Sequence, residues 1–235
     1  MNEQTAAKLR EINRKFYDGL AQPFTQTRQR PHDGFFELLN HFPEGQVSVL
    51  DVGCGNGRYG YFIEQHDRLL NYTGVDFSVG LLENRVELTK PATFREGDMS
   101  QPGFLDGLGQ FDVVSCMAAI HHLPGRANRV RFLQELKEHL KENGRLIISA
   151  WQPIDSERQR RKIRDWSEVD INPANLEPND YLLTWKYGGF AYRYVNIINE
   201  EEMTKLTGEA GLTLLHQFRM DGKEGNLSLY NVISH

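Results

Sequence analysis

The chain has 235 residues, of which 39% are hydrophobic and 25% charged, and its formal net charge is −5. This composition is typical of one globular domain, and it excludes a strongly basic protein with a global electrostatic footprint for nucleic acid. No apolar run is long enough to span a membrane, and the polar start MNEQTAAKLR lacks a signal-peptide core. We therefore expect a cytoplasmic protein with no membrane partner.

The N-terminal region predicts two helices. Apolar residues at Leu9, Ile12, Phe16 and Leu20 share one side of an amphipathic helix over 3–20. A second helix is predicted over 33–41. We expect residues 1–41 to form a helical cap over the substrate side of a single domain that covers 1–235.

A hydrophobic run with a glycine loop follows in VLDVGCGNG, residues 49–57. A buried parallel strand has such a run, and glycines let the backbone turn sharply and approach a ligand closely. The helical pattern resumes at Arg58. Strand, loop and helix together are typical of a nucleotide-type site, whose structural alternative is a plain strand–turn–helix corner.

Strands and helices alternate from there to about residue 150. Apolar runs predict strands over 72–76, 93–98 and 111–116, a helix over 126–140 that Gly144 ends, and a strand over 145–151. Residues 152–195 interrupt this alternation with Pro, Asn and charged residues, and we expect a substrate-facing insertion. A helix over 200–210 and strands over 212–219 and 227–233 complete an α/β doubly wound sheet.

The two cysteines, Cys54 and Cys116, lie in the glycine loop and at a buried strand end. They could approach each other across the sheet edge, but we expect reduced, buried small residues. No Cys/His spacing is typical of zinc, so we expect no metal.

The glycine spacing and its acid distinguish the nucleotide. The loop is G-x-G-x-G, whereas dinucleotide sites have G-x-G-x-x-G, and Asp51 would repel a pyrophosphate. A carboxylate there suits a ligand that has an ammonium and a sulfonium group, as S-adenosylmethionine (SAM) does. The loop resembles motif I of the class I SAM-dependent methyltransferases. That resemblance implies a Rossmann-like fold, with seven mostly parallel strands, an antiparallel last strand and flanking helices.

Acids at two later strand ends extend this resemblance. Asp76 can accept hydrogen bonds from both ribose hydroxyls. The family places a contact to the adenine amino group at the position of Asp98. The expected cofactor-binding residues are Asp51, Gly53, Cys54, Gly55, Asn56, Gly57, Asp76, Phe77, Asp98, Met99 and Met117.

The flanking segments YDGLAQPFTQTR (17–28), HH (121–122), SAW (149–151) and YRY (192–194) are more specific. Together they resemble the tRNA methyltransferases that esterify a carboxymethyl group on wobble uridine. This resemblance implies tRNA as a partner and a substrate pocket surrounded by Arg28, His121, Arg193, Asp221 and Asn226. Some members also work with a small zinc-binding activator subunit, which this sequence neither requires nor excludes.

The C-terminal element departs from that family. It is DGKEGNL here, with two extra residues between Asp221 and Gly225, and Leu227 replaces a tryptophan. The departure weakens the assignment of the substrate more than the assignment of the reaction.

The residue chemistry supports a carboxylate acceptor without deciding it. A carboxylate is already anionic and needs no general base, whereas the fixed donor fork of an arginine such as Arg28 or Arg193 can orient it. An amine or phenol acceptor would need a base, for which His121 or His122 could serve. Trp151 and Trp185 could stack a base or belong to the core.

Two basic clusters flank the expected ligand end of the sheet. They could meet backbone phosphates or form solvated helix faces: Arg126, Arg129 and Arg131, and Arg158, Arg160, Arg161, Lys162 and Arg164. The alternatives are a small-molecule methyltransferase of the same fold, a non-catalytic SAM-binding module and a nicotinamide-dependent oxidoreductase. The glycine spacing and Asp51 disfavour the last of these.

Overall fold

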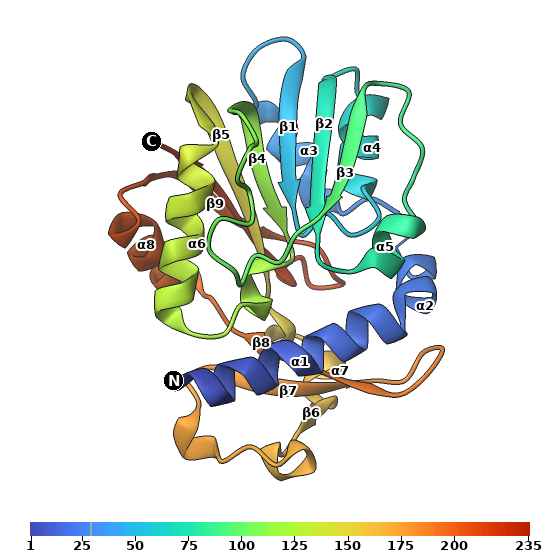
Figure 1. Cartoon of the computed structure of the whole chain (residues 1–235), viewed down its shortest axis with the longest axis vertical. Helices are drawn as coiled ribbons and strands as arrows, with labels where there is room; N and C mark the ends of the chain where they lie inside the picture. The colour runs from blue at the N-terminus through green and yellow to red at the C-terminus, as the bar shows by residue number, and fades with distance from the viewer. Residues whose placement is uncertain (29) are drawn as a thin grey trace.

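The computed structural model describes residues 1–28 and 30–235, and its centre is a seven-stranded sheet (Figure 1). The order is β3-β2-β1-β4-β5-β10-β9, in which β10 runs antiparallel to both neighbours and the first five strands are parallel. The expected class I methyltransferase topology is confirmed. The strands are β1 (Val47–Val52), β2 (Leu69–Asp76), β3 (Ala92–Glu96), β4 (Phe111–Met117), β5 (Leu140–Trp151), β9 (Thr213–Met220) and β10 (Ser228–Ser234).

Helices cover both faces of this sheet. On one face α6 and α8 pack into a core with Leu50, Val114 and Ile148, and on the other face α3 and α4 pack against Val49 and Ile147. Every residue of β1 is buried, as expected for an inner parallel strand. The helices are α1 (Glu3–Gly19), α2 (Ala21–Gln26), α3 (Asp33–Leu38), α4 (Arg58–Gln65), α5 (Val79–Glu83), α6 (Arg126–Glu138), α7 (Glu157–Arg160) and α8 (Glu200–Glu209).

A second, three-stranded sheet lies beyond the carboxyl ends of the parallel strands. It consists of β6 (Ile163–Arg164), β7 (Asp180–Trp185) and β8 (Ala191–Asn196), all antiparallel. Figure 1 shows α1 between the two sheets, and the Asn13 amide both donates to Tyr194 O (3.1 Å) and accepts from Tyr194 N (2.8 Å). The sequence predicted an insertion over 152–195 but not this hairpin.

The expected helix end at Gly144 is wrong. Helix α6 ends at Glu138, and β5 begins at Leu140, opposite Phe111. The pairing register then shifts, and Gly144 passes so close to β4 that a Cβ there would lie 3.0 Å from Asp112 O. Glycine is needed for this close approach at a bulge and not for a helix end.

Among the residues that the structure describes, no helix combines the length and the apolar character that crossing a bilayer requires.

Candidate active site

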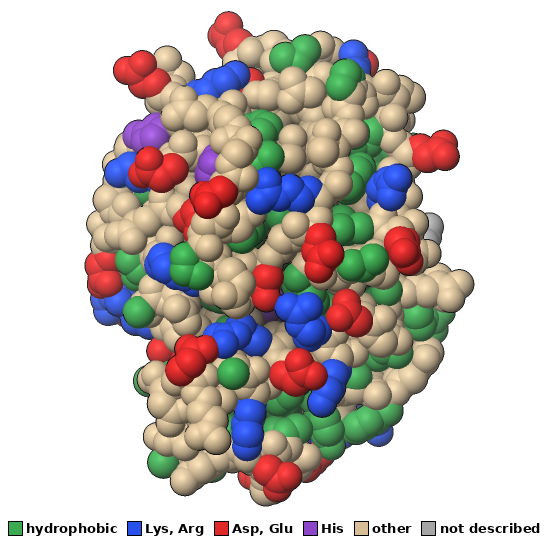
Figure 2. Space-filling view, in the orientation of Figure 1, with side chains coloured by type: hydrophobic (Ala, Val, Ile, Leu, Met, Phe, Trp, Pro, Cys, Tyr) green, Lys and Arg blue, Asp and Glu red, His purple; other side chains and the backbone are tan. Residues whose placement is uncertain are grey.

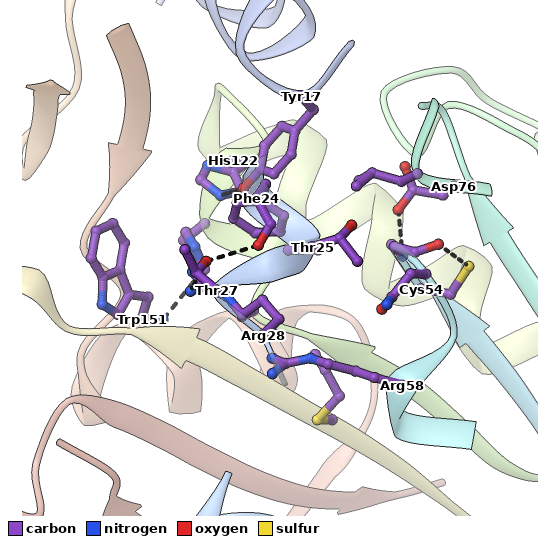
Figure 3. Close-up of a pocket in the computed structure, with 18 of the residues that line it drawn as sticks. Tyr17, Phe24, Thr25, Thr27, Arg28, Cys54, Arg58, Asp76, His122 and Trp151 are labelled. Atoms are coloured by element: carbon purple, nitrogen blue, oxygen red, sulfur yellow. Dashed lines mark hydrogen bonds between the residues drawn. The ribbon is translucent and has the colours of Figure 1, made fainter. Parts of the chain in front are cut away.

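A cavity of about 600 Å³ opens at the carboxyl ends of β1, β2 and β4, where the two sheets face each other. Ligands of open α/β sheets bind at this edge, where the strand order reverses. One side of the cavity is the glycine loop with the strand ends. The other side comes from α2, the segment at Arg28, the η2 turn (Ile120–His122), α7 and the β7–β8 hairpin. Figure 3 shows Phe24 of α2, Arg28 and His122 apart from Cys54 and Asp76.

The glycine loop and Asp76 are joined by a hydrogen bond. Gly55 adopts φ +56° and donates its N–H to Asp76 Oδ2 at 2.8 Å, while Ser78 N–H donates to Oδ1 at 2.9 Å. A Cβ at Gly55 would meet nothing within 4 Å, so this backbone faces open space. Each carboxylate oxygen keeps a lone pair for a ribose hydroxyl. Burial raises the pKa of Asp76 to about 6.

Asp51 is fully enclosed beneath the loop. It accepts hydrogen bonds from Tyr72 Oη at 2.8 Å and Ser115 Oγ at 2.7 Å, and it also lines the cavity. Burial raises its pKa to about 6 even though both hydrogen bonds favour the carboxylate form. Two carboxylates therefore lie on one side of the cavity, as a ligand with a positive charge and a ribose requires.

Of the other residues predicted to bind the cofactor, some line the cavity and some do not. Apolar side chains line the cavity at Phe77, Met99 and Met117, together with Cys54 and Asn56 of the loop. Asp98 is not in the lining, because its Oδ2 pairs with Arg14 Nη2 at 3.0 Å and its Oδ1 accepts from Ser100 N. Gly57 is also outside the lining and caps α4 with φ +79°.

The two histidines of η2 both reach the cavity but differ in what they offer. Both ring nitrogens of His122 already have hydrogen-bond partners: Nδ1 donates to Tyr194 O (2.8 Å), and Nε2 accepts from Tyr17 Oη (2.7 Å). His121 Nδ1 accepts from Trp151 N at 3.2 Å, so the neutral ring carries its proton on Nε2. Burial lowers the pKa of His122 to about 3 and that of His121 well below 6.5. His121 therefore offers a neutral N–H donor.

Three guanidinium groups line the cavity: those of Arg28 and Arg193 come from the opposite side, and that of Arg58 comes from the start of α4, directly after the glycine loop. Among residues 1–28 and 30–235, no carboxylate lies within ion-pairing distance of any of them. Burial, followed by the charges of Arg58 and Arg193, lowers the pKa of Arg28 to about 10. Figure 3 shows Arg28 and Arg58 close together and apart from Asp76. Arg193 is buried, and Arg28 and Arg58 are partly buried. Because buried charges are normally paired, these groups together are complementary to an anion.

Aromatic rings fix the position of Arg193. Its guanidinium lies 4.3 Å from the ring centroid of Trp151, 5.0 Å from that of Phe16 and 5.9 Å from that of Trp185. The Arg193 Nε is buried, and no described residue forms a hydrogen bond with it. Stacked rings hold the charge in place without neutralising it. Trp151 and Trp185 thus support an arginine here.

Asp221 and Asn226 are not in the cavity lining. Asp221 accepts from Gly34 N (3.1 Å) and Tyr230 Oη (2.6 Å) and pairs with His32 Nδ1 at 3.1 Å. Burial opposes ionisation, but the His32 and Tyr230 hydrogen bonds outweigh it and lower the pKa of Asp221. Asp221 thereby ties the start of α3 to the final strand, and its partner His32 lines the cavity.

The first basic cluster forms internal contacts. Arg126 pairs with Glu202 and Glu209, and buried Arg129 pairs with Glu177 at 2.8 Å. Of the second cluster, Arg158 and Lys162 line the cavity. On the face drawn in Figure 2, acidic and basic side chains are interspersed.

Sequence reasoning missed Arg58 and Gln159. Arg58 directly follows the glycine loop, so its position alone could have indicated a cavity residue. Gln159 is 6% exposed and lines the cavity, and its Oε1 is buried without a hydrogen-bond partner among the described residues. Only the tertiary structure identifies Gln159, since α7 has four residues and no motif.

The sheet topology, the glycine loop and the two buried carboxylates define a SAM-dependent methyltransferase. A family model described as a methyltransferase domain matches residues 9–217, and the chain therefore belongs to that family. SAM is its cofactor. The carboxylates of Asp51 and Asp76 fit it, because they can accept hydrogen bonds from its ammonium and ribose hydroxyl groups.

Similar sequences support this assignment at low identity. A protein of Encephalitozoon cuniculi with a provisional methyltransferase name is 28% identical over 92% of this chain and 93% of its own length. The tRNA (carboxymethyluridine(34)-5-O)-methyltransferase of Schizosaccharomyces pombe is 25% identical over 87% of this chain and 90% of that enzyme. The enzyme of the same name from Xenopus tropicalis is 31% identical over 65% of this chain, which covers 23% of that longer protein.

Solved structures share the fold. A Haloferax volcanii methyltransferase, in a complex with the Trm112 methyltransferase activator, has a TM-score of 0.64 at 15% identity and covers 94% of this chain and 97% of its own. The glycopeptide N-methyltransferase MtfA complexed with SAM has a TM-score of 0.60 at 16% identity and covers 86% of this chain and 92% of its own.

Proposed function

We propose that this methyltransferase esterifies a carboxylate, namely the carboxymethyl group on the wobble uridine of tRNA. The observation that carries the proposal is that Arg28, Arg58 and Arg193 line one cavity and that none of them forms an ion pair with a described carboxylate. An anionic acceptor would neutralise this charge. The names of the Schizosaccharomyces pombe and Xenopus tropicalis relatives describe this reaction.

SAM supplies a methyl group on a sulfonium, and its transfer to a carboxylate oxygen leaves a neutral thioether. The task of the protein is therefore to orient the acceptor and exclude water, which is worth roughly 7–11 kcal/mol in well-aligned systems. Arg28 and Arg193 would hold the acceptor carboxylate by their donor forks. His121 would donate a hydrogen bond from its Nε2–H to the acceptor. No group has to remove a proton, so the two histidines that burial keeps neutral fit this chemistry.

The Gln159 amide supports a uridine acceptor. A side-chain amide presents a donor and an acceptor side by side, and the imide edge of uracil presents the complementary pair. A buried acceptor oxygen without a partner costs free energy until a ligand satisfies it. Arg158 and Lys162, from the same segment, would meet the flanking phosphates.

A small-molecule acid is the second candidate acceptor. The internal ion pairs of Arg126 and Arg129 favour it, because they remove one of the two basic clusters from any RNA surface. A cavity of about 600 Å³ is also within the size range of metabolite sites. Both candidates use the same arginines, so the experiment has to distinguish the acceptors.

The test is the transfer of labelled methyl from SAM into tRNA, followed by nucleoside analysis. The tRNA comes from cells that lack the endogenous wobble-uridine esterase, so that the free carboxymethyl group is present. Label in an alkali-labile methyl ester of uridine is the expected result, with tRNA as the partner.

Two further arms make a negative result informative. One adds a Trm112-type activator subunit, since the Haloferax volcanii neighbour is described in a complex with one. The other offers a panel of small carboxylic acids. Label in a small acid, and none in tRNA with or without the activator, would replace the tRNA proposal with the small-molecule function.

A further inference from the structure

A cluster of metal-ligand side chains lies outside the active-site cavity, where helix α3 meets the edge strand β9. Glu37 belongs to α3, His41 to the following 3₁₀ turn η1 (Leu39–His41), and His216 to β9. One ligand atom from each residue lies within 4.8 Å of the other two. None of the three residues lines the cavity.

The His41 ring has a nitrogen without a partner. Its Nε2 is buried, and no described residue forms a hydrogen bond with it. Glu37 Oε1 is 3.7 Å away, which is beyond hydrogen-bond distance, and Asn40 Nδ2 donates to the other carboxylate oxygen. On its other side the His41 ring stacks on His216, with centroids 4.7 Å apart and planes at 26°. A buried polar nitrogen in such a place requires an explanation.

A β-bulge places His216 against the His41 ring. In β9, His216 pairs with Val232 and Leu214 pairs with Ile233, so the register skips Leu215. In a regular strand Leu214 and His216 would point to the same face. Here Leu214 packs into the core under α6 and α8, whereas Phe218 packs into the core on the α3 side, and His216 contacts both Phe218 and His41. Bulges that redirect a side chain are common beside functional sites.

The donor set determines the class of ion. Two imidazoles and one carboxylate are ligands for zinc and its neighbours, whereas Mg²⁺ and Ca²⁺ prefer oxygen donors. The Glu37 side chain is 42% exposed and His216 is also exposed, so both can rotate toward an ion.

We propose that Glu37, His41 and His216 bind one divalent transition-metal ion of the zinc type, with water completing a tetrahedral site. The ligand atoms would close to about 2.0–2.2 Å from the ion. The ion would link α3 and the turn that follows it to the edge strand β9. Because α3 follows the segment that includes Arg28 and His32, this link would stabilise one wall of the cavity without touching the reacting groups.

The experiment measures Zn²⁺ binding to the full chain, without an affinity tag, after treatment with a chelator. Titration in competition with a chromophoric chelator gives the stoichiometry and Kd, and Co²⁺ in place of Zn²⁺ reports a tetrahedral site by its visible absorption. One ion per chain is expected. His41→Gln and His216→Gln should each weaken binding about 100-fold, because each removes one of three ligands.

His66→Gln is the matched control, since His66 is also a surface histidine and contacts the same helix through Phe36. It should leave the Kd unchanged within about twofold. A His216→Gln variant that binds zinc as the unaltered chain does, or a chain that takes up no zinc, would overturn the proposal. Because His216 is exposed, its replacement should leave the fold intact, and circular dichroism checks this. Neither result depends on which acceptor the enzyme methylates.

Discussion

The two sides of the active-site cavity differ in charge and in construction. The cofactor side consists of strand ends and a glycine loop, and its carboxylates, Asp51 and Asp76, each accept two hydrogen bonds from the fold. The acceptor side comes from short helices and a hairpin, and no described carboxylate pairs with its guanidinium groups. The fold itself supplies hydrogen-bond partners for the carboxylates, whereas the guanidinium groups would gain their counter-charge from an anionic ligand.

This difference directs each ligand to its place. A sulfonium is attracted by the acidic side and repelled by the basic side, whereas an anionic acceptor has the opposite preference. His121, which comes from the η2 turn on the basic side, lines the same cavity with a neutral ring.

Removing Arg28 tests the basic side most strongly. Arg28→Ala should lower kcat/KM by about 1000-fold, because truncating one partner of a buried charge pair costs about 2–5 kcal/mol. The SAM Kd, measured by calorimetry, should change less than about twofold. Arg28→Lys keeps the charge but loses the fork, and should recover only part of the activity. Wild-type turnover in the alanine variant would disprove the assigned role.

Removing the Asp76 charge tests the acidic side. Asp76→Asn should weaken SAM binding about 100-fold, since the carboxylate also holds the N–H of Gly55 and Ser78 in place. The KM for the acceptor at saturating SAM should stay near its normal value. Equal losses in both parameters would show that the two sides do not act separately.

Replacing Asp221 should lower the free energy of unfolding and leave the turnover of the acceptor unchanged. Asp221→Ala leaves Gly34 N–H and the Tyr230 hydroxyl without their acceptor, at a cost of about 2 kcal/mol in the free energy of unfolding. Asp221→Asn is the matched variant, because it keeps an acceptor oxygen and tolerates the φ of +71°. Urea denaturation measures both. A large loss of kcat in fully folded Asp221→Asn would instead place this residue in catalysis.

The pH dependence of SAM binding should follow the acidic side. The pKa of Asp51 and that of Asp76 are both raised to about 6, so each carboxyl takes up a proton as the pH falls through 6. The neutral form attracts the cationic cofactor less. The Kd for SAM should therefore rise about tenfold between pH 7 and pH 5 and stay flat above pH 7. A Kd that is constant down to pH 5 would contradict this account.

Gln159 gives the smallest expected effect and the most specific one. Gln159→Ala should raise the KM for the tRNA acceptor about fivefold, which corresponds to one neutral hydrogen bond of about 1 kcal/mol. An acceptor methylated at uracil N3 should show the same penalty in the unaltered enzyme and no further penalty in the variant. Additive penalties would mean that Gln159 does not contact the imide edge.

The cofactor side was largely predictable, and the acceptor side was not. Residues 49–57 encode a buried strand and a turn in adjacent positions, so Asp51 and the glycines could be placed from the pattern alone. Asp98 also follows a strand, but Arg14 from α1 occupies its carboxylate, and no local pattern indicates that ion pair. Gly144 was misassigned because helix ends and bulges both favour glycine.

The sequence by itself determined the succession of strands and helices, the glycine loop and its acid, because hydrophobic periodicity and turn chemistry act between residues close together in the chain. The class of cofactor followed from the resemblance that this loop carries. Only the tertiary structure decided which charges meet. It brought Arg28, Arg58 and Arg193 into one cavity, turned Asp221 toward His32, and placed His216 against His41. These contacts join segments far apart in the chain, and their energies depend on burial and on the partners present, which no local pattern contains.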